Sequence, residues 1–261
     1  MHILDVVFKT TYELSIREVH IMENTGIMKN AINIERSVIN KKPHRKLHIK
    51  EPGSAITHFI GMVMAFFASV PLLIRAAAQP QKIYIVAMSI YAASLILLYA
   101  ASTTYHTFDI SEKTNTILKK IDHMMISVLI AGSYTPVCLL ALKGRIGIIL
   151  LSIVWAIAIA GILIKAFWVY CPKWVSSVLY IGMGWTCVLA FTQLLDNLSP
   201  AAFGWLLAGG IIYTVGGVIY ALKLPLFNSR HKNFGSHEIF HLFVMGGSAC
   251  HFIVMYAYLL P

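Results

Sequence analysis

Seven long apolar segments constrain the fold of this chain more than any other feature of its sequence. Each segment is close to the roughly 20 residues that an α-helix needs to cross the hydrocarbon core of a bilayer. We expect them at 54–75, 83–106, 121–142, 146–167, 174–195, 201–223 and 236–260. Their apolar runs are continuous and do not alternate, which indicates helices and not the strands of a barrel. The sequence therefore predicts an all-α, integral membrane bundle of seven transmembrane helices.

The composition agrees with a membrane protein and excludes other classes. Of the 261 residues, 58% are hydrophobic and 12% are charged, whereas about a quarter of the residues of an average soluble domain are charged. This balance excludes an ordinary soluble domain and a disordered chain. The net charge of +10 would suggest a nucleic-acid partner in a soluble protein. In a membrane protein, positive charge sets the orientation instead.

The positions of lysine and arginine predict that orientation. Of the 21 basic residues, 17 lie in the N-terminal tail or in the loops after the second, fourth and sixth segments. Because basic residues gather on the cytosolic side, we expect a cytosolic N-terminus and an outside C-terminus, with no nucleic-acid partner. Residues 1–50, with the basic run KKPHRK at 41–46, are expected to form a cytosolic, partly disordered tail, and residues 51–261 the transmembrane domain.

Ionisable residues in or beside the apolar segments are candidates for function, because burying them in a membrane is costly. In the predicted topology, four segments bring such residues to the cytosolic leaflet. The ionisable residues at this leaflet are Glu51, His58, His106, Asp122, His123, His237, Glu238 and His241. Asp196 falls at the opposite side, where we expect a solvated residue. His251 lies about 21 Å along the helix from His237, and we expect a buried structural histidine there.

The spacing of the histidines indicates a metal site. His237 and His241 stand about one helical turn apart, so both imidazoles can reach one ion. With His106 they offer three nitrogen ligands and leave a position open, which is the pattern of a catalytic zinc. Asp122 could accept a proton from the zinc-bound water or orient it. Ser102, one turn deeper than His106, could donate to the water or to a developing oxyanion.

Each of these residues also has a structural interpretation. An HxxxH pattern often arises by chance from histidines at interfacial depth. Asp122 could face Lys119 or Lys120 at the start of a helix, and Ser102 could bond the backbone of its own helix. Glu51 could serve only as a helix start, since a proline follows it.

The run HEIFH also matches the HExxH pattern of zinc proteases, in which Glu238 would be the general base. We do not favour a protease, because the third histidine comes from an SxxxH pattern in a separate segment. The four cysteines show no CxxC pair, so neither a disulfide framework nor a cysteine zinc site is indicated.

The motifs EPGSAITHFIG, STTYH, KKIDHMMISVLIAGSYTP and HEIFHLFVMGGSACHF resemble, in order and spacing, those of the hemolysin III family. This family is the bacterial branch of the progestin and adipoQ receptors, and the wider superfamily includes alkaline ceramidases. The resemblance covers roughly residues 48–260. The sequence differs from the family pattern at Ser54, where asparagine is common, and at Lys50, where glutamate is often found.

The resemblance implies a multi-pass protein of the bacterial cell membrane with a zinc ion near the cytosolic side. By analogy with the adiponectin receptors, the zinc ligands would be His106, His237 and His241. The same resemblance implies that Asp122 lies close to the zinc-bound water and Ser102 near the metal.

Three functions follow as hypotheses. We favour a zinc-dependent hydrolase of a lipid amide or ester, with Asp122 and Ser102 as catalytic residues and membrane lipid as its partner. The alternative is a non-enzymatic receptor-like or membrane-homeostasis protein with a structural zinc. A pore-forming or cytolytic protein is less favoured, because no segment carries a continuous polar stripe that could line a channel. The sequence assigns no oligomeric state.

Overall fold

A computed structural model describes residues 2–24, 26, 29–30, 33–35, 49–142, 144–222 and 235–261. The elements among these residues are helices. The chain divides into two compact units, Met1–His48 and Ile49–Pro261, and each is described by itself. The basic run at 41–46 and the loop at 223–234, which both contribute to the predicted orientation, lie outside the described residues.

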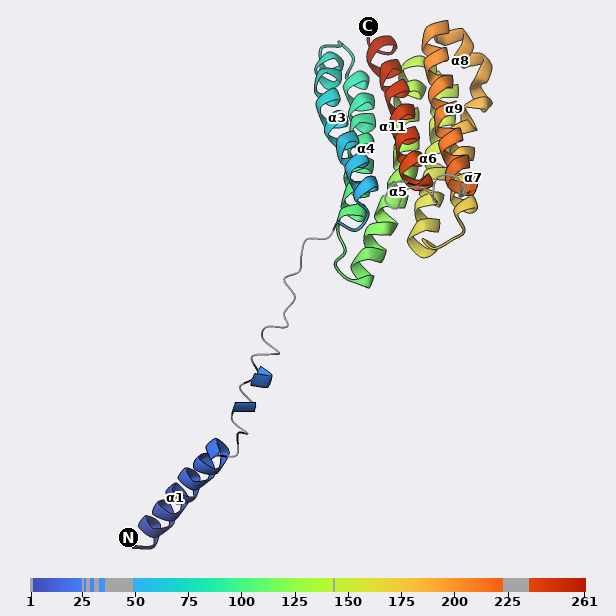
Figure 1. Cartoon of the computed structure of the whole chain (residues 1–261). Coiled ribbons are helices and arrows are strands. Elements are labelled where there is room, and N and C mark those ends of the chain that lie inside the picture. Colours follow the sequence, from blue (N-terminus) through green and yellow to red (C-terminus); the bar gives the residue numbers. More distant parts are fainter. Residues whose placement is uncertain are drawn as a thin grey trace. The chain divides into compact units, whose positions relative to one another are not determined.

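The first unit contains the helix α1 (His2–Asn24) (Figure 1). The sequence pattern of this tail predicts no helix. The described side chains of α1, from Phe8 to Ile21, are all exposed. Packing of an apolar face supplies most of the stability of helices in proteins, and within its unit α1 buries none of these side chains.

The second unit holds seven helical spans that are long and apolar enough to cross a membrane (Figure 1). In chain order they are α3 (Pro52–Ala77), α4 (Lys82–Thr107), α5 (Glu112–Pro136) continued by the π-helix η1 (Val137–Leu142), α6 (Gly144–Phe167), α7 (Lys173–Gly184) continued by the 3-10 helix η2 (Trp185–Ala190) and α8 (Phe191–Asn197), α9 (Pro200–Leu222), and α11 (Ser236–Ile253) continued by the π-helix η3 (Val254–Tyr258). The predicted fold of seven apolar helices is confirmed.

The third span begins at Glu112 and not near 121, where the apolar pattern placed it. Ser111 caps α5, because its hydroxyl accepts a hydrogen bond from the backbone N–H of Thr114 at 3.2 Å. The negative charge of Glu112 in the first turn also suits the positive end of the helix dipole. These first turns are polar, so a search for apolar residues misses them. Asp122 therefore lies about 15 Å inside α5 and does not open it.

Close packing of the last two spans depends on glycine. Gly247 of α11 lies against the ring of Tyr213 on α9, where an added Cβ would stand 2.8 Å from the ring. Small residues let helix backbones approach in this way inside membranes. The helix α11 also contacts α3, so the seventh span lies beside the first as well as the sixth.

The fifth span is interrupted by η2, whose tighter turn breaks the regular α-helical hydrogen-bond ladder. The hydroxyl of Tyr134 on α5 donates to the carbonyl of Gly184 at 2.6 Å and accepts from the N–H of Cys187 at 2.9 Å. One phenol from the third span therefore serves two backbone groups at the break.

Candidate metal centre

One end of the bundle, here called the histidine end, gathers His58, His106, His237 and His241. It forms where α4 ends and where α3 and α11 begin. Two backbone hydrogen bonds join the entry of α3 to the last turn of α4: Glu51 N–H donates to the carbonyl of His106 at 2.9 Å, and Lys50 N–H donates to the carbonyl of Thr107 at 3.2 Å. This short connection fixes Glu51 beside His106.

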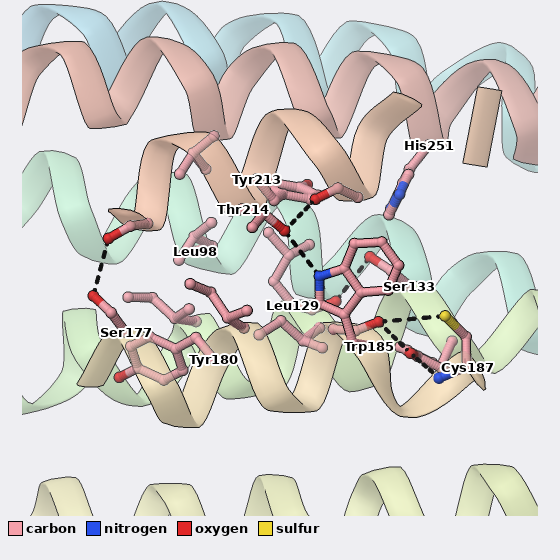
Figure 2. A pocket seen from close by; sticks show the side chains of 18 of the residues that line it. Leu98, Leu129, Ser133, Ser177, Tyr180, Trp185, Cys187, Tyr213, Thr214 and His251 are labelled. Atoms are coloured by element: carbon pink, nitrogen blue, oxygen red, sulfur yellow. Dashed lines mark hydrogen bonds between the residues drawn. The ribbon is translucent and has the colours of Figure 1, made fainter. Parts of the chain in front are cut away.

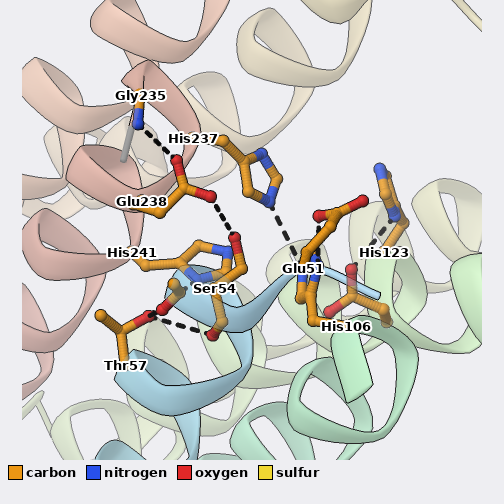
Figure 3. A network of polar contacts seen from close by, with 11 residues as sticks. Glu51, Ser54, Thr57, His106, His123, Gly235, His237, Glu238 and His241 are labelled. Carbon is orange, nitrogen blue, oxygen red and sulfur yellow. Dashed lines mark hydrogen bonds and ion pairs between the residues drawn. The ribbon is translucent and has the colours of Figure 1, made fainter. Parts of the chain in front are cut away.

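Three imidazoles converge at this end, as the sequence predicts. Ring nitrogens of His106, His237 and His241 all lie within 4.8 Å of one another. His106 and His241 are buried and His237 is partly buried. The Nε2 atoms of His106 and His237 are 3.4 Å apart (Figure 3). Such a cluster could hold a metal ion.

The outer nitrogens of two of these rings are engaged, which leaves their inner nitrogens for a metal. Nδ1 of His106 lies 2.7 Å from Oε2 of Glu51, and a carboxylate can only accept, so Nδ1 carries the proton. Nδ1 of His241 lies 3.3 Å from the hydroxyl of Thr57 (Figure 3). The single proton of that hydroxyl points to the carbonyls of Gly53 and Ser54, both 3.0 Å away, so a lone pair of the hydroxyl is left to accept from Nδ1.

In both rings the proton on Nδ1 leaves the lone pair of Nε2 for a metal. Metal-binding histidines almost always donate their second N–H to a carboxylate, a carbonyl or water in this manner. The donor set and its outer partners therefore fit a zinc ion bound by three neutral imidazoles.

Glu51 has more than a role in starting α3. It precedes the helix as the N-cap residue but makes no side-chain capping hydrogen bond. The hydrogen bond from His106 holds the pKa of the Glu51 carboxyl below its usual value. Of the two interpretations left open by the sequence, the geometry favours the functional one, in which a charged carboxylate orients a ligand.

The carboxylate of Glu238 is hydrogen-bonded at the start of α11. Its Oε1 accepts from the hydroxyl of Ser54 and its Oε2 accepts from the N–H of Gly235, both at 2.7 Å (Figure 3). The contact with Gly235 is one half of a capping box, in which the third residue of a helix bonds back to the backbone N–H of its N-cap. Both carboxylate oxygens have partners, so the arrangement does not favour Glu238 as the general base of a protease. It also gives Ser54 a defined contact.

Asp122 and Ser102 face the same cavity as His58, His237 and His241. Both side chains are buried, with 7% and 1% of their surface exposed. Nδ1 of the neighbouring His123 lies 2.9 Å from the carbonyl of Lys119 and 3.4 Å from the carboxylate of Asp122. Lys119, one of the two lysines considered as a partner for Asp122, lies over the ring of Tyr170, with its Nζ 4.3 Å from the ring centre.

His58 is a fourth imidazole at this end, and the sequence left its role open. Its ring stacks on that of His241, with centroids 3.6 Å apart and an angle of 14° between the planes. The ring of Tyr99 meets it edge to face at 5.1 Å. The side chain of His58 is 3% exposed, and neither nitrogen has a hydrogen-bond partner in the described part of the chain.

From the histidine end, the cavity extends into the bundle between α5, α7, α9 and α11 (Figure 2). Its walls are mostly apolar, with side chains such as Leu98, Leu129 and Val244. It reaches His251, which lines it at greater depth. Asp196, by contrast, is exposed at the end of α8, as expected from the sequence.

Comparison with known proteins gives independent evidence on the family of this chain. Residues 47–252 match the family described as "Haemolysin-III related". The chain is 39% identical over 212 residues to "Hemolysin-3" of Bacillus cereus, covering 81% of this chain and 93% of that protein. It is 42% identical over 209 residues to the "Hemolysin-3 homolog" of Bacillus subtilis (strain 168), covering 80% and 94% of the two chains.

A more distant similarity extends to animal receptors. The chain is 23% identical over 221 residues to the "Adiponectin receptor protein" of Drosophila melanogaster, covering 77% of this chain and 49% of that protein.

Proposed function

The chain belongs to the haemolysin III-related family, and from that premise we propose that this multi-pass cell-membrane protein is a zinc-dependent hydrolase of a lipid amide or ester. One observation carries the proposal: two histidines of the cluster, His237 and His241, line a mostly apolar cavity that Asp122 and Ser102 also line. A metal centre at the end of an apolar cavity suits a substrate with a reactive carbonyl and a long hydrocarbon chain.

Zinc is the metal that this donor set favours. Three imidazoles and an open position are typical of catalytic zinc, whereas magnesium and calcium prefer oxygen ligands. When bound, zinc supplies a polarised substrate carbonyl and a bound water that ionises near neutral pH. His106, His237 and His241 would hold it through Nε2.

The remaining chemistry belongs to this chain's own side chains. Asp122 would receive the proton of the attacking water and return it to the leaving group. Ser102 would donate a hydrogen bond to the oxygen that becomes negative when the carbonyl is attacked. The apolar wall excludes bulk water, which strengthens both interactions. In the predicted orientation, this end of the bundle takes its substrate from the cytosolic leaflet.

A second candidate is a receptor-like or homeostasis protein in which zinc is structural. One observation favours it: the metal ligands come from α4 and α11, so that an ion would join two spans distant in the sequence. A cytolytic function, which the names of the bacterial relatives suggest, would require membrane leakage by the purified protein.

The decisive experiment measures zinc and turnover in the same preparations. We expect stoichiometric zinc in the wild type, its loss in His106→Ala, and its retention in Asp122→Asn with lipid amide hydrolysis reduced at least a hundredfold. Asp196→Asn, which removes an exposed carboxylate, is the control and should behave as wild type. Hydrolysis at the wild-type rate by zinc-loaded Asp122→Asn would exclude the assigned mechanism. Absence of turnover together with a lower thermal stability after zinc removal would favour the receptor-like alternative.

A further inference from the structure

The last turn of α9 places a phenol at the metal end of the cavity. Tyr220 lines this cavity together with His237 and Asp122. The centre of its ring lies 5.6 Å from that of His237 and 4.9 Å from that of Phe240. The side chain of Tyr220 therefore lies directly beside one of the candidate metal ligands.

The hydroxyl of Tyr220 differs from those of the other described tyrosines that line the cavity. The other three hydroxyls have protein partners at 2.6 to 2.9 Å, and they belong to Tyr134, Tyr180 and Tyr213. The hydroxyl of Tyr220 makes no hydrogen bond with the described part of the chain. Its hydrogen-bonding capacity is therefore left for a ligand.

This hydroxyl is also open to contact. The unpaired hydroxyl of Tyr91, by comparison, is sealed inside the bundle. Tyr220 is only partly buried, and its oxygen is not one of the sealed, unpaired atoms among the described residues. A small polar group of a bound molecule can therefore reach it.

Two carboxylates show where the hydroxyl lies. The charges of Asp122 and Glu51 both act on the phenol of Tyr220. Asp122 lines the cavity beside the histidines, and Glu51 accepts a hydrogen bond from His106 at 2.7 Å. The hydroxyl of Tyr220 therefore lies near the centre that these residues surround.

The ring that carries the hydroxyl is held from two sides. Nζ of Lys173, at the start of α7, lies 4.2 Å from the centre of the Tyr220 ring, where an ammonium is attracted by the aromatic face. Phe240 of α11 packs on the ring at a tilt of 35°. These contacts restrict the phenol, so it presents its hydroxyl at a defined position.

We propose that the hydroxyl of Tyr220 donates a hydrogen bond to an oxygen of the carbonyl or carboxylate group that a lipid presents to the metal centre. This inference rests on the proposed function, which places such a group there. Carbonyl and carboxylate oxygens only accept, so the phenol is the donor. In the proposed reaction, Tyr220 is a catalytic residue that assists Ser102 at the oxygen that becomes negative.

The first test measures binding and requires no turnover. It compares the affinity of a fluorescent fatty acid, which has the carboxylate of the expected product, for zinc-loaded full chains in lipid nanodiscs. Tyr220→Phe removes the hydroxyl and keeps the ring, and we expect it to bind about tenfold more weakly than the wild type. Its zinc content and melting temperature should match the wild type, because the hydroxyl has no partner in the described part of the chain.

Tyr170→Phe is the matched control. Tyr170 also has a lysine over its ring, with Nζ of Lys119 4.3 Å from the ring centre. It is exposed in the loop between α6 and α7 and does not line the cavity. The same substitution at this position should leave the affinity for the fatty acid unchanged.

The second test measures hydrolysis of a lipid amide. A donor to the developing negative charge acts more strongly in the transition state than on the bound substrate. We therefore expect kcat to fall roughly tenfold to a hundredfold in Tyr220→Phe, with a smaller change in KM. Tyr170→Phe should keep the wild-type kcat.

The outcomes separate this inference from the proposed function. Wild-type affinity for the fatty acid in Tyr220→Phe would overturn the inference, and so would loss of zinc from that variant, because the phenol would then act on the metal. Absence of fatty-acid binding by the wild type would also overturn it. Weaker binding by Tyr220→Phe, combined with a wild type that hydrolyses neither lipid amides nor esters, would confirm the contact and overturn the proposed function.

Discussion

The carboxylate of Glu51 accepts a hydrogen bond from Nδ1 of His106 at 2.7 Å, between a residue that precedes the first span and one that closes the second. The contact keeps the proton of the ring on Nδ1 and leaves Nε2 free for a metal. It links the metal centre to the packing of α3 on α4.

Removing the charge of Glu51 should weaken metal binding without removing a ligand. Loss of a residue that orients a metal ligand typically lowers metal affinity tenfold to a hundredfold. We expect a loss of this size in Glu51→Gln, measured by competition with a chromogenic chelator. Glu112→Gln changes an exposed carboxylate at the start of α5 and serves as the control. Equal zinc affinity of Glu51→Gln and wild type would contradict the role given to Glu51.

Glu238→Gln should separate the capping role of this residue from catalysis. The amide keeps one acceptor, for either Ser54 or Gly235, and loses the favourable charge near the positive end of the α11 dipole. We expect destabilisation by about 1 kcal/mol, with zinc content and any hydrolysis retained. Thermal unfolding in detergent measures the destabilisation, and metal analysis measures the zinc content. A selective loss of hydrolysis by more than a hundredfold would restore Glu238 as a general base.

A pair of adjacent glycines offers a matched test of packing between α9 and α11. A Cβ on Gly247 would stand 2.8 Å from the Tyr213 ring, whereas one on Gly246 would stand 3.5 Å from its nearest neighbour, Ile212. Gly247→Ala should therefore destabilise the bundle by about 1–3 kcal/mol. Gly246→Ala should be neutral or slightly stabilising, because alanine favours helix more than glycine does. Equal melting temperatures of the two variants would contradict this packing.

Arg75 should stabilise the end of the seventh span. Its guanidinium donates to the carbonyl of Tyr256 at 2.9 Å and to that of Leu260 at 3.2 Å. These groups lie at or beyond the end of the helical ladder, where carbonyls lack partners of their own. We expect Arg75→Met to cost about 1–3 kcal/mol in thermal unfolding, and Lys82→Met, at an exposed helix start, to have little effect. If Arg75→Met melts at the wild-type temperature, water replaces the guanidinium as the hydrogen-bond donor to these carbonyls.

Cys171, in the loop between α6 and α7, should react at lower pH than an ordinary thiol. Burial raises the pKa of this thiol, but hydrogen bonds from Lys165, at 2.9 Å, and from Ser176 outweigh it and hold the pKa below its usual value. Since only the thiolate reacts, the alkylation rate should rise with pH earlier than it does for a free thiol. Lys165→Met should move that rise to higher pH.

The alkylation measurement uses a chain in which Cys171 is the single cysteine. Lys173→Met is the matched control, since the ammonium of Lys173 lies over the ring of Tyr220, 4.2 Å from its centre. This control should leave the pH profile of Cys171 unchanged. A profile that does not move in Lys165→Met would remove the lysine as the cause.

The metal cluster was predictable because it depends on where spans begin and end. Apolar length fixes the ends of the helices, and the alternation of direction brings His106 to the level of His237 and His241. The outer partners were not predictable in the same way. The contact of Glu51 with His106 depends on a short turn before α3, and that of Glu238 with Ser54 depends on how two distant helices pack.

Local polar structure accounts for the other differences. The start of α5 was placed too late because its first turns are polar and are stabilised by a cap. Stacking of His58 on His241 involves no sequence pattern at all, since it joins two helices at a distance set by tertiary packing.

The break in the fifth span has a consequence for assembly. In the two-stage view of membrane folding, each helix is stable in the bilayer before it meets its neighbours. The fifth span departs from that view, because Tyr134 of the third span satisfies the carbonyl of Gly184 and the N–H of Cys187 at η2. Until the third span is alongside, these groups face hydrocarbon without that phenol. We therefore expect the fifth span to complete its hydrogen bonding at η2 only after the third span lies beside it.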